Sequence, residues 1–352
     1  MLARIWIMVS LLLSISSYSA IAAVILQYHH VDSSTPASTS IDPAQFEAHM
    51  QYLADNGFKV LPVSQIVDAI KHQKALPDKA VAITFDDAYL DILTNAKPIL
   101  DKFDYPYTIF INPDIINRGS LLYMSWQQLR DLAEQDVIIA NHGFYHDSLA
   151  RVPRDMDELA WLEQQRLLLL QAEKEIEQKT GKSYRYFAYP YGEYSPTIQS
   201  WLENNDFVGF SQQSGAVGLT TSLSAIPRFP ASKPYDKLTS LRDKLNSLPF
   251  VITLDKKNAE TIYQYGQVKS VTMNVVVDDF RKSQLNCYVS GIGKQKVKWL
   301  DEETFTINFT NDLSPGRVRG NCTAPSISEP GRYYWYSKPW FILRPDNEWY
   351  PL

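Results

Sequence analysis

The chain has 352 residues, of which 45% are hydrophobic and 21% are charged, so it can bury a large core and lacks the composition of a disordered protein. Its length is more than one typical domain needs and suits two. The formal net charge of −5, without any basic run, argues against a nucleic-acid partner.

Residues 1–23 have the pattern of a secretory signal peptide. Arg4 supplies the positive charge, Ile5–Ile15 form the apolar stretch, and Ala20–Ala22 form a small-residue cleavage site. The apolar stretch is short for a membrane span, although an uncleaved anchor is the alternative. We therefore expect an exported protein, periplasmic or secreted, with no stable membrane span after cleavage.

Residues 24–254 alternate between apolar runs and amphipathic stretches. Strands are predicted at 24–31, 59–63, 81–85, 107–112, 137–140, 186–189 and 207–211. Helices are predicted at 42–56, 64–72, 90–103, 125–134, 157–179 and 195–204. Strands that alternate with helices at this spacing indicate parallel βαβ units, closed or nearly closed into an α/β barrel.

Residues 255–352 differ, because their apolar residues alternate with polar ones in the stretches Val271–Val277 and Phe305–Phe309. This period of two predicts a small antiparallel β-sandwich. The only two cysteines, Cys287 and Cys322, lie in this part of the chain. An oxidising compartment would allow them to form a disulfide.

Chemically active side chains follow two of the predicted strands. Asp86 and Asp87 end one apolar run, and His142 and His146 follow another. The carboxyl ends of parallel strands meet at one end of a barrel, where catalytic groups collect. One carboxylate and two imidazoles form a facial metal site, and the second carboxylate is then free to act as a base. The pattern predicts a metal-dependent hydrolase.

The distribution of the six histidines narrows the choice of a general acid. His49 and His72 lie on predicted amphipathic helices and are expected to face solvent. With two further histidines assigned to the metal, only His29 or His30 remains, both at the end of the first strand. Alternation along a strand points these two side chains to opposite sides.

Three motifs resemble a known family. Thr84–Asp87, the His-x3-His pair and Phe187–Gly192 are similar to the polysaccharide deacetylases of the NodB-homology type, carbohydrate esterase family 4. The resemblance covers about residues 24–230. Tyr28–His29 further resembles the branch that acts on poly-β-1,6-N-acetylglucosamine. The resemblance implies a distorted (β/α) barrel, a polysaccharide substrate and a divalent metal, with zinc expected first and nickel, cobalt or iron as alternatives.

The resemblance also implies a role for each matching residue. Asp86 would be the general base, Asp87, His142 and His146 the metal ligands, His29 the general acid, Pro190 the pocket wall, Tyr191 the oxyanion donor through its backbone N–H, and Arg228 the residue that orients the base.

The chain departs from the family pattern at three positions. Ala88 stands where the aspartate motif usually continues with glycine, and Gly143 replaces the usual Ser or Thr. Ala188 occupies a position where many members carry an arginine, so Arg228 would have to serve alone. None of these changes removes a metal ligand or the base.

We expect an N-deacetylase of a polysaccharide that contains N-acetylglucosamine. The alternatives are an O-acetyl esterase, a chitin or peptidoglycan deacetylase, and an inactive barrel that binds glycans. The aromatic residues Trp335, Tyr336, Trp340 and Phe341 fit either a glycan-binding face or a sandwich core. The sequence gives no information on protein partners.

Overall fold

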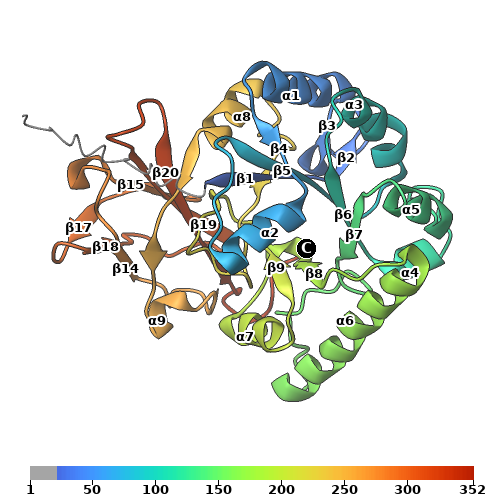
Figure 1. The fold of residues 1–352 in the computed structure, drawn as a ribbon. Helices are drawn as coiled ribbons and strands as arrows, with labels where there is room; N and C mark the ends of the chain where they lie inside the picture. The colour runs from blue at the N-terminus through green and yellow to red at the C-terminus, as the bar shows by residue number, and fades with distance from the viewer. Residues whose placement is uncertain (1–21) are drawn as a thin grey trace, which may run out of the picture.

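The computed structural model describes residues 22–352, so the predicted signal peptide lies outside the described residues except for its last two positions. A barrel of parallel strands and helices is followed by two packed β-sheets, at the right and left of Figure 1. The expected distorted (β/α) barrel followed by a β-sandwich is therefore confirmed.

Eight parallel strands form the barrel sheet in the order β10-β1-β5-β6-β7-β8-β9, with β4 beside β5. Every strand predicted for this part of the chain is present, several of them shorter than predicted. Their bounds are β1 (Ala23–Tyr28), β4 (Lys59–Val60), β5 (Ala80–Asp86), β6 (Tyr107–Ile111), β7 (Ile138–Asn141), β8 (Tyr186–Ala188), β9 (Val208–Phe210) and β10 (Phe229–Pro230). A separate two-stranded sheet pairs β2 (His30–Val31) with β3 (Ser40–Ile41).

The segment 223–231 closes the barrel, and only its last part is a regular strand. The Ile226 N–H donates to the Gly209 carbonyl of β9 at 2.8 Å, and the Ala231 N–H donates to the Gln27 carbonyl of β1 at 2.9 Å. One short segment thus joins the two edges of the sheet. This limited pairing accounts for the distortion of the barrel.

Side chains of alternating size fill the barrel interior. Ala82, Ala140 and Ala188 are buried on β5, β7 and β8, and Phe110 and Phe210 are buried on β6 and β9. Small residues thus lie between the large rings, which leaves no room for a channel at this level. Polar groups occur at the carboxyl ends of these strands.

Helices cover the outside of the barrel, except α2 (Val63–His72), whose apolar side chains pack against the interior cluster (Figure 1). The bounds of the others are α1 (Pro43–Asp55), α3 (Lys97–Lys102), α4 (Pro113–Asn117), α5 (Trp126–Ala133), α6 (Glu158–Thr180), α7 (Pro196–Asn204) and α8 (Leu238–Leu245). Asp42 caps α1 by accepting from the Ala44 N–H, as its place before a first-turn proline predicted. The helix predicted at 90–103 is a π-helical turn, Ile92–Ala96, followed by α3.

The C-terminal part contains two sheets and the short helix α9 (Lys256–Ala259). One sheet has the order β11-β20-β19-β15-β16 with β13 beside β20, and the other has the order β12-β14-β18-β17. The bounds are β11 (Ser247–Pro249), β12 (Ile252–Thr253), β13 (Ile262–Tyr263), β14 (Ser270–Val275), β15 (Asn286–Val289), β16 (Gly293–Gln295), β17 (Val297–Trp299), β18 (Thr304–Asn308), β19 (Gly316–Pro325) and β20 (Tyr333–Ile342).

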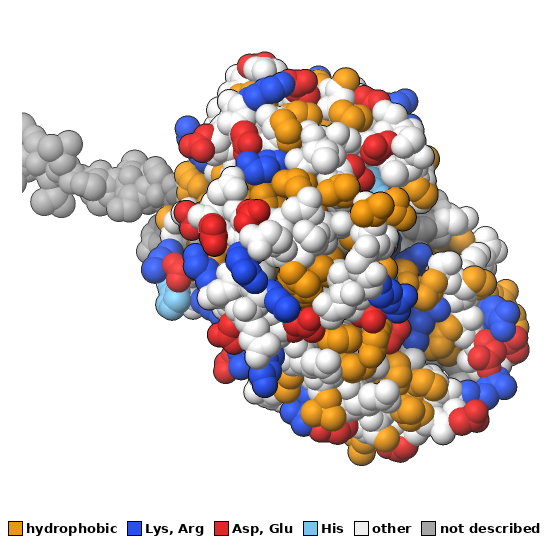
Figure 2. Space-filling view, turned by 90° about the vertical axis from the view of Figure 1, so that its right-hand side faces the viewer, with side chains coloured by type: hydrophobic (Ala, Val, Ile, Leu, Met, Phe, Trp, Pro, Cys, Tyr) orange, Lys and Arg blue, Asp and Glu red, His pale blue; other side chains and the backbone are white. Residues whose placement is uncertain are grey.

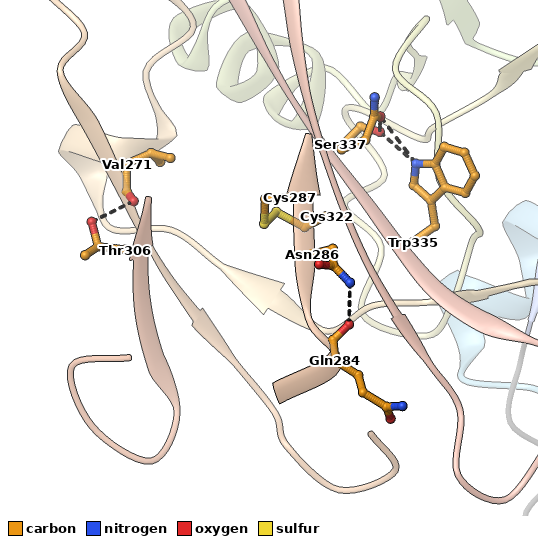
Figure 3. Close-up of a disulfide and its surroundings, with 9 residues drawn as sticks. Val271, Gln284, Asn286, Cys287, Thr306, Cys322, Trp335 and Ser337 are labelled. Carbon is orange, nitrogen blue, oxygen red and sulfur yellow. Dashed lines mark hydrogen bonds between the residues drawn. A yellow bond between two sulfur atoms is a disulfide. The ribbon is translucent and has the colours of Figure 1, made fainter. Parts of the chain in front are cut away.

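The main ladders of the sandwich are antiparallel, as expected, whereas β11 and β13 pair with β20 in parallel. The two sheets enclose one apolar core. Cys287 on β15 and Cys322 on β19 are direct partners across the ladder and are joined by a disulfide. Figure 3 shows this disulfide on the opposite side of the sheet from Trp335.

The sandwich packs directly against the barrel. The rings of Trp335 on β20 and Phe229 on β10 meet edge to face at 5.2 Å. Near the C-terminus, the Tyr350 hydroxyl donates to the buried carboxylate of Glu193 at 2.7 Å. The C-terminus therefore lies against the barrel, as its mark in Figure 1 indicates.

Candidate active site

Asp86 is the last residue of β5 and is completely buried. Arg228 donates to both of its carboxylate oxygens, at 2.7 and 2.9 Å, and Gln27 donates to Oδ2 at 2.7 Å. Burial alone would raise the pKa of Asp86, but the guanidinium of Arg228 and the neighbouring histidines together outweigh it and hold the pKa well below its ordinary value. Asp86 is therefore a fixed anion at the end of its strand.

Asp87 leaves the strand in a left-handed conformation, with φ of 75°. Regular alternation would point its side chain away from that of Asp86. Instead its Oδ1 lies 3.5 Å from His142 Nε2 and 3.4 Å from His146 Nε2. The three ligand atoms of this cluster all lie within 4.8 Å of one another.

The hydrogen bonding and burial of His142 indicate whether this cluster suits a metal. Its Nδ1–H donates to the Ala188 carbonyl at 2.8 Å, so Nε2 carries the lone pair. Nε2 is buried and has no hydrogen-bond partner among residues 22–352. Burial lowers the pKa of His142 to about 3, so the ring stays neutral and able to ligate.

Burial also lowers the pKa of His146 and raises that of Asp87. The Asp87 carboxylate consequently needs a nearby cation to remain charged. Two neutral imidazoles and a carboxylate converging on one point fit a divalent metal. The structure thus brings together the three side chains that the motifs implied as ligands.

His29 lies between β1 and β2 with its Nε2 3.9 Å from Asp86 Oδ2. Its Nδ1 is buried and has no hydrogen-bond partner among the described residues. His30 is engaged elsewhere, because its Nδ1 hydrogen-bonds to Asp91 at 2.6 Å and its ring stacks on Tyr89 at 3.5 Å. The two histidines diverge as strand alternation predicted, and His29 is the one beside Asp86.

Pro190 and Tyr191 begin the loop after β8. Tyr191 has a φ of 59°, and its ring meets that of His146 edge to face at 4.5 Å. Gly192 follows with φ of 70°, and a Cβ there would lie 2.6 Å from Gln212 Cβ. The glycine is required for this tight path. The loop therefore lies against one histidine of the metal cluster.

Two of the three departures from the family pattern have visible consequences. Ala88 has a φ of 56°, a conformation that glycine adopts without strain, which accounts for the usual glycine. The Ala188 side chain is small and buried, and the Arg228 side chain packs over Phe110 at 5.1 Å. Arg228 reaches Asp86 from the closing segment of the barrel.

Sequence reasoning missed two neighbours of the site. Gln27 is a buried polar residue within the apolar strand β1, a signal that could have been noticed, and it holds Asp86. Tyr89 hydrogen-bonds to Asp87 and stacks on Tyr123 at 4.9 Å. Tyr123 belongs to another loop, so no local pattern announces this contact.

Of the two predictions for histidines outside the site, one is confirmed and one is wrong. His72 is exposed, as expected. The prediction that His49 faces solvent is wrong, because its ring is buried between the Tyr28 hydroxyl at 3.0 Å and the Asp236 carbonyl at 2.7 Å. Both partners lie outside α1, so its amphipathic pattern did not reveal them.

The C-terminal aromatic residues are mostly core. Trp340 is fully buried against Phe309, and Phe341 is buried where the sandwich meets the barrel. Trp335 is only partly buried. Tyr336 is also partly buried and packs against the core of the sandwich, whereas the partly accessible ring of Trp335 meets Phe229 of the barrel.

The charge distribution on the surface and the apolar length of the helices bear on whether the protein binds nucleic acid or spans a membrane. Figure 2 views the side at the right of Figure 1 and shows acidic and basic side chains interspersed, with no field of one sign on that face. Within residues 22–352, no helix is both long and apolar enough to cross a membrane.

Residues 73–209 match the family model for polysaccharide deacetylase. The chain is 26% identical over 137 residues to the poly-beta-1,6-N-acetyl-D-glucosamine N-deacetylase of Escherichia coli, covering 34% of this chain but 20% of that protein. It is 26% identical over 238 residues to the protein of the same name from Staphylococcus epidermidis, covering 61% of this chain and 81% of that protein.

Two solved structures have a similar fold. The Streptococcus pyogenes deacetylase PplD matches with a TM-score of 0.57 and 19% identity over 64% of this chain and 99% of its own. IcaB from Ammonifex degensii matches with a TM-score of 0.55 and 23% identity over 63% of this chain and 97% of its own. Together with the match of residues 73–209, these likenesses confirm the resemblance that the motifs indicated: this part of the chain matches the polysaccharide deacetylase model, and the barrel has the fold of solved deacetylases.

Proposed function

We propose that the protein is an exported, metal-dependent N-deacetylase of a polysaccharide that contains N-acetylglucosamine, with poly-β-1,6-N-acetylglucosamine as its first expected substrate. One observation carries the proposal: the buried, unpartnered Nε2 of His142 faces Asp87 and His146 beside an ionised carboxylate, Asp86. The names of the relatives support the substrate.

Asp87, His142 and His146 would hold the metal, and zinc suits two imidazoles and a carboxylate. A divalent metal held there would lower the pKa of a bound water to about 7 and would polarise the acetyl carbonyl. Asp86, held by Arg228 and Gln27, would accept the proton of the attacking water.

His29 and Tyr191 would serve the two remaining steps, protonation of the amine and stabilisation of the oxyanion. His29 would protonate the departing amine, which is a poor leaving group without a proton. The backbone N–H of Tyr191 would stabilise the oxyanion, a role in which one donor typically contributes about 3 kcal/mol. Proximity of His29 Nε2 to Asp86 Oδ2 supports a shared substrate position.

The test is acetate release from β-1,6-linked N-acetylglucosamine oligomers, compared with chitin oligomers, peptidoglycan fragments and acetylated xylan, with and without a chelator. We expect chelator-sensitive release from the β-1,6 oligomers. Release only from another substrate would keep the chemistry and change the substrate. Glycan binding that survives chelation, without any acetate, would favour a binding protein.

A matched pair of variants tests the metal site. His142→Gln should lose bound metal, measured by mass spectrometry of the purified protein, because it removes a buried ligand. His72→Gln changes an exposed histidine on α2 and should retain the metal. Equal metal content in both variants would contradict the assignment.

A further inference from the structure

A cavity of about 340 Å³ lies where the barrel meets the sandwich. Its walls come from α8 and the loop before it on one side, and from β19 and β20 on the other. The side chains that the argument uses are Tyr235, Asp243, Arg317, Arg319, Tyr333 and Trp335.

The alternation of β19 explains why this wall is basic. Val318 and Cys322 face the apolar core of the sandwich, where they are buried. Arg317, Arg319 and Asn321 occupy the alternate positions and therefore face the barrel, where they line the cavity.

The two arginines lack acidic partners. Neither Arg317 nor Arg319 has a carboxylate within ion-pair distance among residues 22–352, although the chain as a whole is acidic. Burial, together with the neighbouring charge of Arg317, lowers the pKa of Arg319. Asp243 is the one carboxylate among the residues that line the cavity. Two adjacent guanidinium groups without counterions favour an anionic ligand.

The cavity adjoins the proposed active site. Arg317 Nη1 donates to the Tyr191 carbonyl at 3.3 Å, and its guanidinium lies 5.8 Å from the Tyr191 ring. The other side of the Tyr191 ring meets His146. One side chain thus separates the cavity wall from a metal ligand, so a glycan could extend from one to the other.

Aromatic rings supply sugar-sized flat surfaces. Tyr235, Tyr333 and Trp335 line the cavity and keep part of their surface accessible. The Trp335 indole N–H donates to Ser337 Oγ at 3.2 Å, which fixes the ring on its strand (Figure 3). Rings with a polar handle of this kind suit a partly wet binding surface.

We infer that this cavity is a subsite for a sugar unit that carries a carboxylate or another oxyanion, on the same glycan whose acetyl group is presented to the metal cluster. The inference rests on the proposed N-deacetylase activity and narrows its substrate. It favours a polysaccharide that combines N-acetylglucosamine with acidic units over the homopolymer poly-β-1,6-N-acetylglucosamine, which has no acidic unit. The two arginines would also repel the ammonium groups of deacetylated units, so the cavity would bind acetylated substrate in preference to deacetylated product.

Binding is best measured by calorimetry on full-length protein carrying Asp86→Asn, so that turnover does not interfere. The probes are a tetrasaccharide of alternating N-acetylglucosamine and glucuronic acid, neutral chitotetraose, and the glucosamine tetramer. We expect the acidic probe to bind about tenfold more tightly than the neutral one at low salt, with the difference shrinking as salt rises. The glucosamine tetramer should bind most weakly.

Arg317→Gln and Arg319→Gln should each remove most of this preference, while Arg281→Gln, an exposed arginine elsewhere in the sandwich, should leave it intact. If Arg319→Gln does not fold, the exposed Arg317 carries the test. Equal binding of acidic and neutral probes, or a preference that survives both changes, would overturn the subsite.

Inorganic phosphate separates a glycan subsite from a site for free anions. Displacement of the acidic tetrasaccharide only by high phosphate concentrations supports the subsite, and phosphate binding as tight as that of the tetrasaccharide overturns it. Acetate release by unmodified protein is scored separately. An arginine-dependent preference without acetate release would sustain the subsite and reject the proposed function.

Discussion

The proposed site at the strand ends of the barrel and the core of the sandwich differ in how far their buried polar groups are hydrogen-bonded. At the site, His29 Nδ1 and His142 Nε2 are buried without partners, and an ionised Asp86 is buried beside them. Among the described residues of the sandwich, Arg344 Nε is the single buried side-chain atom left without a partner. Within residues 22–352, Tyr107, Thr108 and Ser148 of the barrel also have buried hydroxyls without a partner. Unsatisfied groups cost stability, so the two unpartnered imidazoles beside an ionised carboxylate indicate function.

The backbone shows the same contrast. Asp87, Ala88, His146 and Tyr191 all have positive φ values and surround the proposed metal cluster. Other non-glycine residues of the barrel with positive φ values, such as Lys79 and Asp136, lie outside the site. Within residues 255–352, Asn347 is the one non-glycine residue with a positive φ. The strained residues around the site would aim the proposed ligands, while the sandwich gains stability from regular ladders and a disulfide.

The largest effect is expected from Asp86→Asn. An amide cannot accept a proton from water, so turnover should fall by about 10² to 10⁴-fold. Asp279→Asn is the matched control in the sandwich, where Asp279 accepts from Ser326 and Tyr334. Acetate release and the unfolding midpoint should be measured for both. Turnover within tenfold of the unmodified protein after Asp86→Asn would remove the contrast between the two regions.

Loss of the disulfide should affect stability and spare the chemistry. Cys287 and Cys322 are separated by 35 residues, and a closed loop of that size contributes about 4 kcal/mol on the chain-entropy model. The double alanine variant should therefore unfold at a lower urea concentration while its turnover at 25 °C stays the same. A parallel loss of turnover in the folded state would show that the two regions are coupled.

Two glycines allow a direct comparison of the regions. A Cβ on Gly209 would lie 2.2 Å from the Ser224 carbonyl oxygen, and a Cβ on Gly320 would lie 2.6 Å from the Trp340 ring. Either alanine should destabilise the protein by about 1–3 kcal/mol. Gly209→Ala should also lower turnover, because Gly209 pairs with the closing segment that carries Arg228. Unchanged turnover in folded Gly209→Ala protein would contradict this link.

The smallest expected effect concerns pH. Burial lowers the pKa of His49 to about 4, against about 6.5 in an unfolded chain. Between these values the unfolded state binds more protons, so the free energy of unfolding falls as the pH falls, by up to about 1.4 kcal/mol per pH unit. Urea titrations between pH 4 and 7 measure this slope.

His49→Gln keeps a donor and an acceptor at this position and should flatten the slope, since glutamine does not titrate. His72→Gln, at an exposed position, should leave the slope unchanged. If the unmodified protein and His49→Gln have the same slope, His49 is not held neutral by burial.

Local sequence patterns determined the elements and the ligands. Strand and helix periods depend on neighbouring residues, so the strands of the barrel and the alternation in β14 and β18 were predictable. The apolar runs before the two aspartates and before the two histidines predicted that these side chains meet at the strand ends, and the family resemblance then implied Asp87, His142 and His146 as the proposed ligands.

The tertiary structure alone decided which groups control the site. The family resemblance had implied that Arg228 orients Asp86, but only the structure shows that Gln27 holds the same carboxylate. Likewise, only the structure shows that His49 is buried against the carbonyl of Asp236, just before α8. Arg317 of the sandwich donates to the carbonyl of Tyr191 in the barrel. These contacts join residues far apart in the chain, where neither period nor motif constrains the partner, so only the closure of the barrel and the docking of the sandwich bring them together.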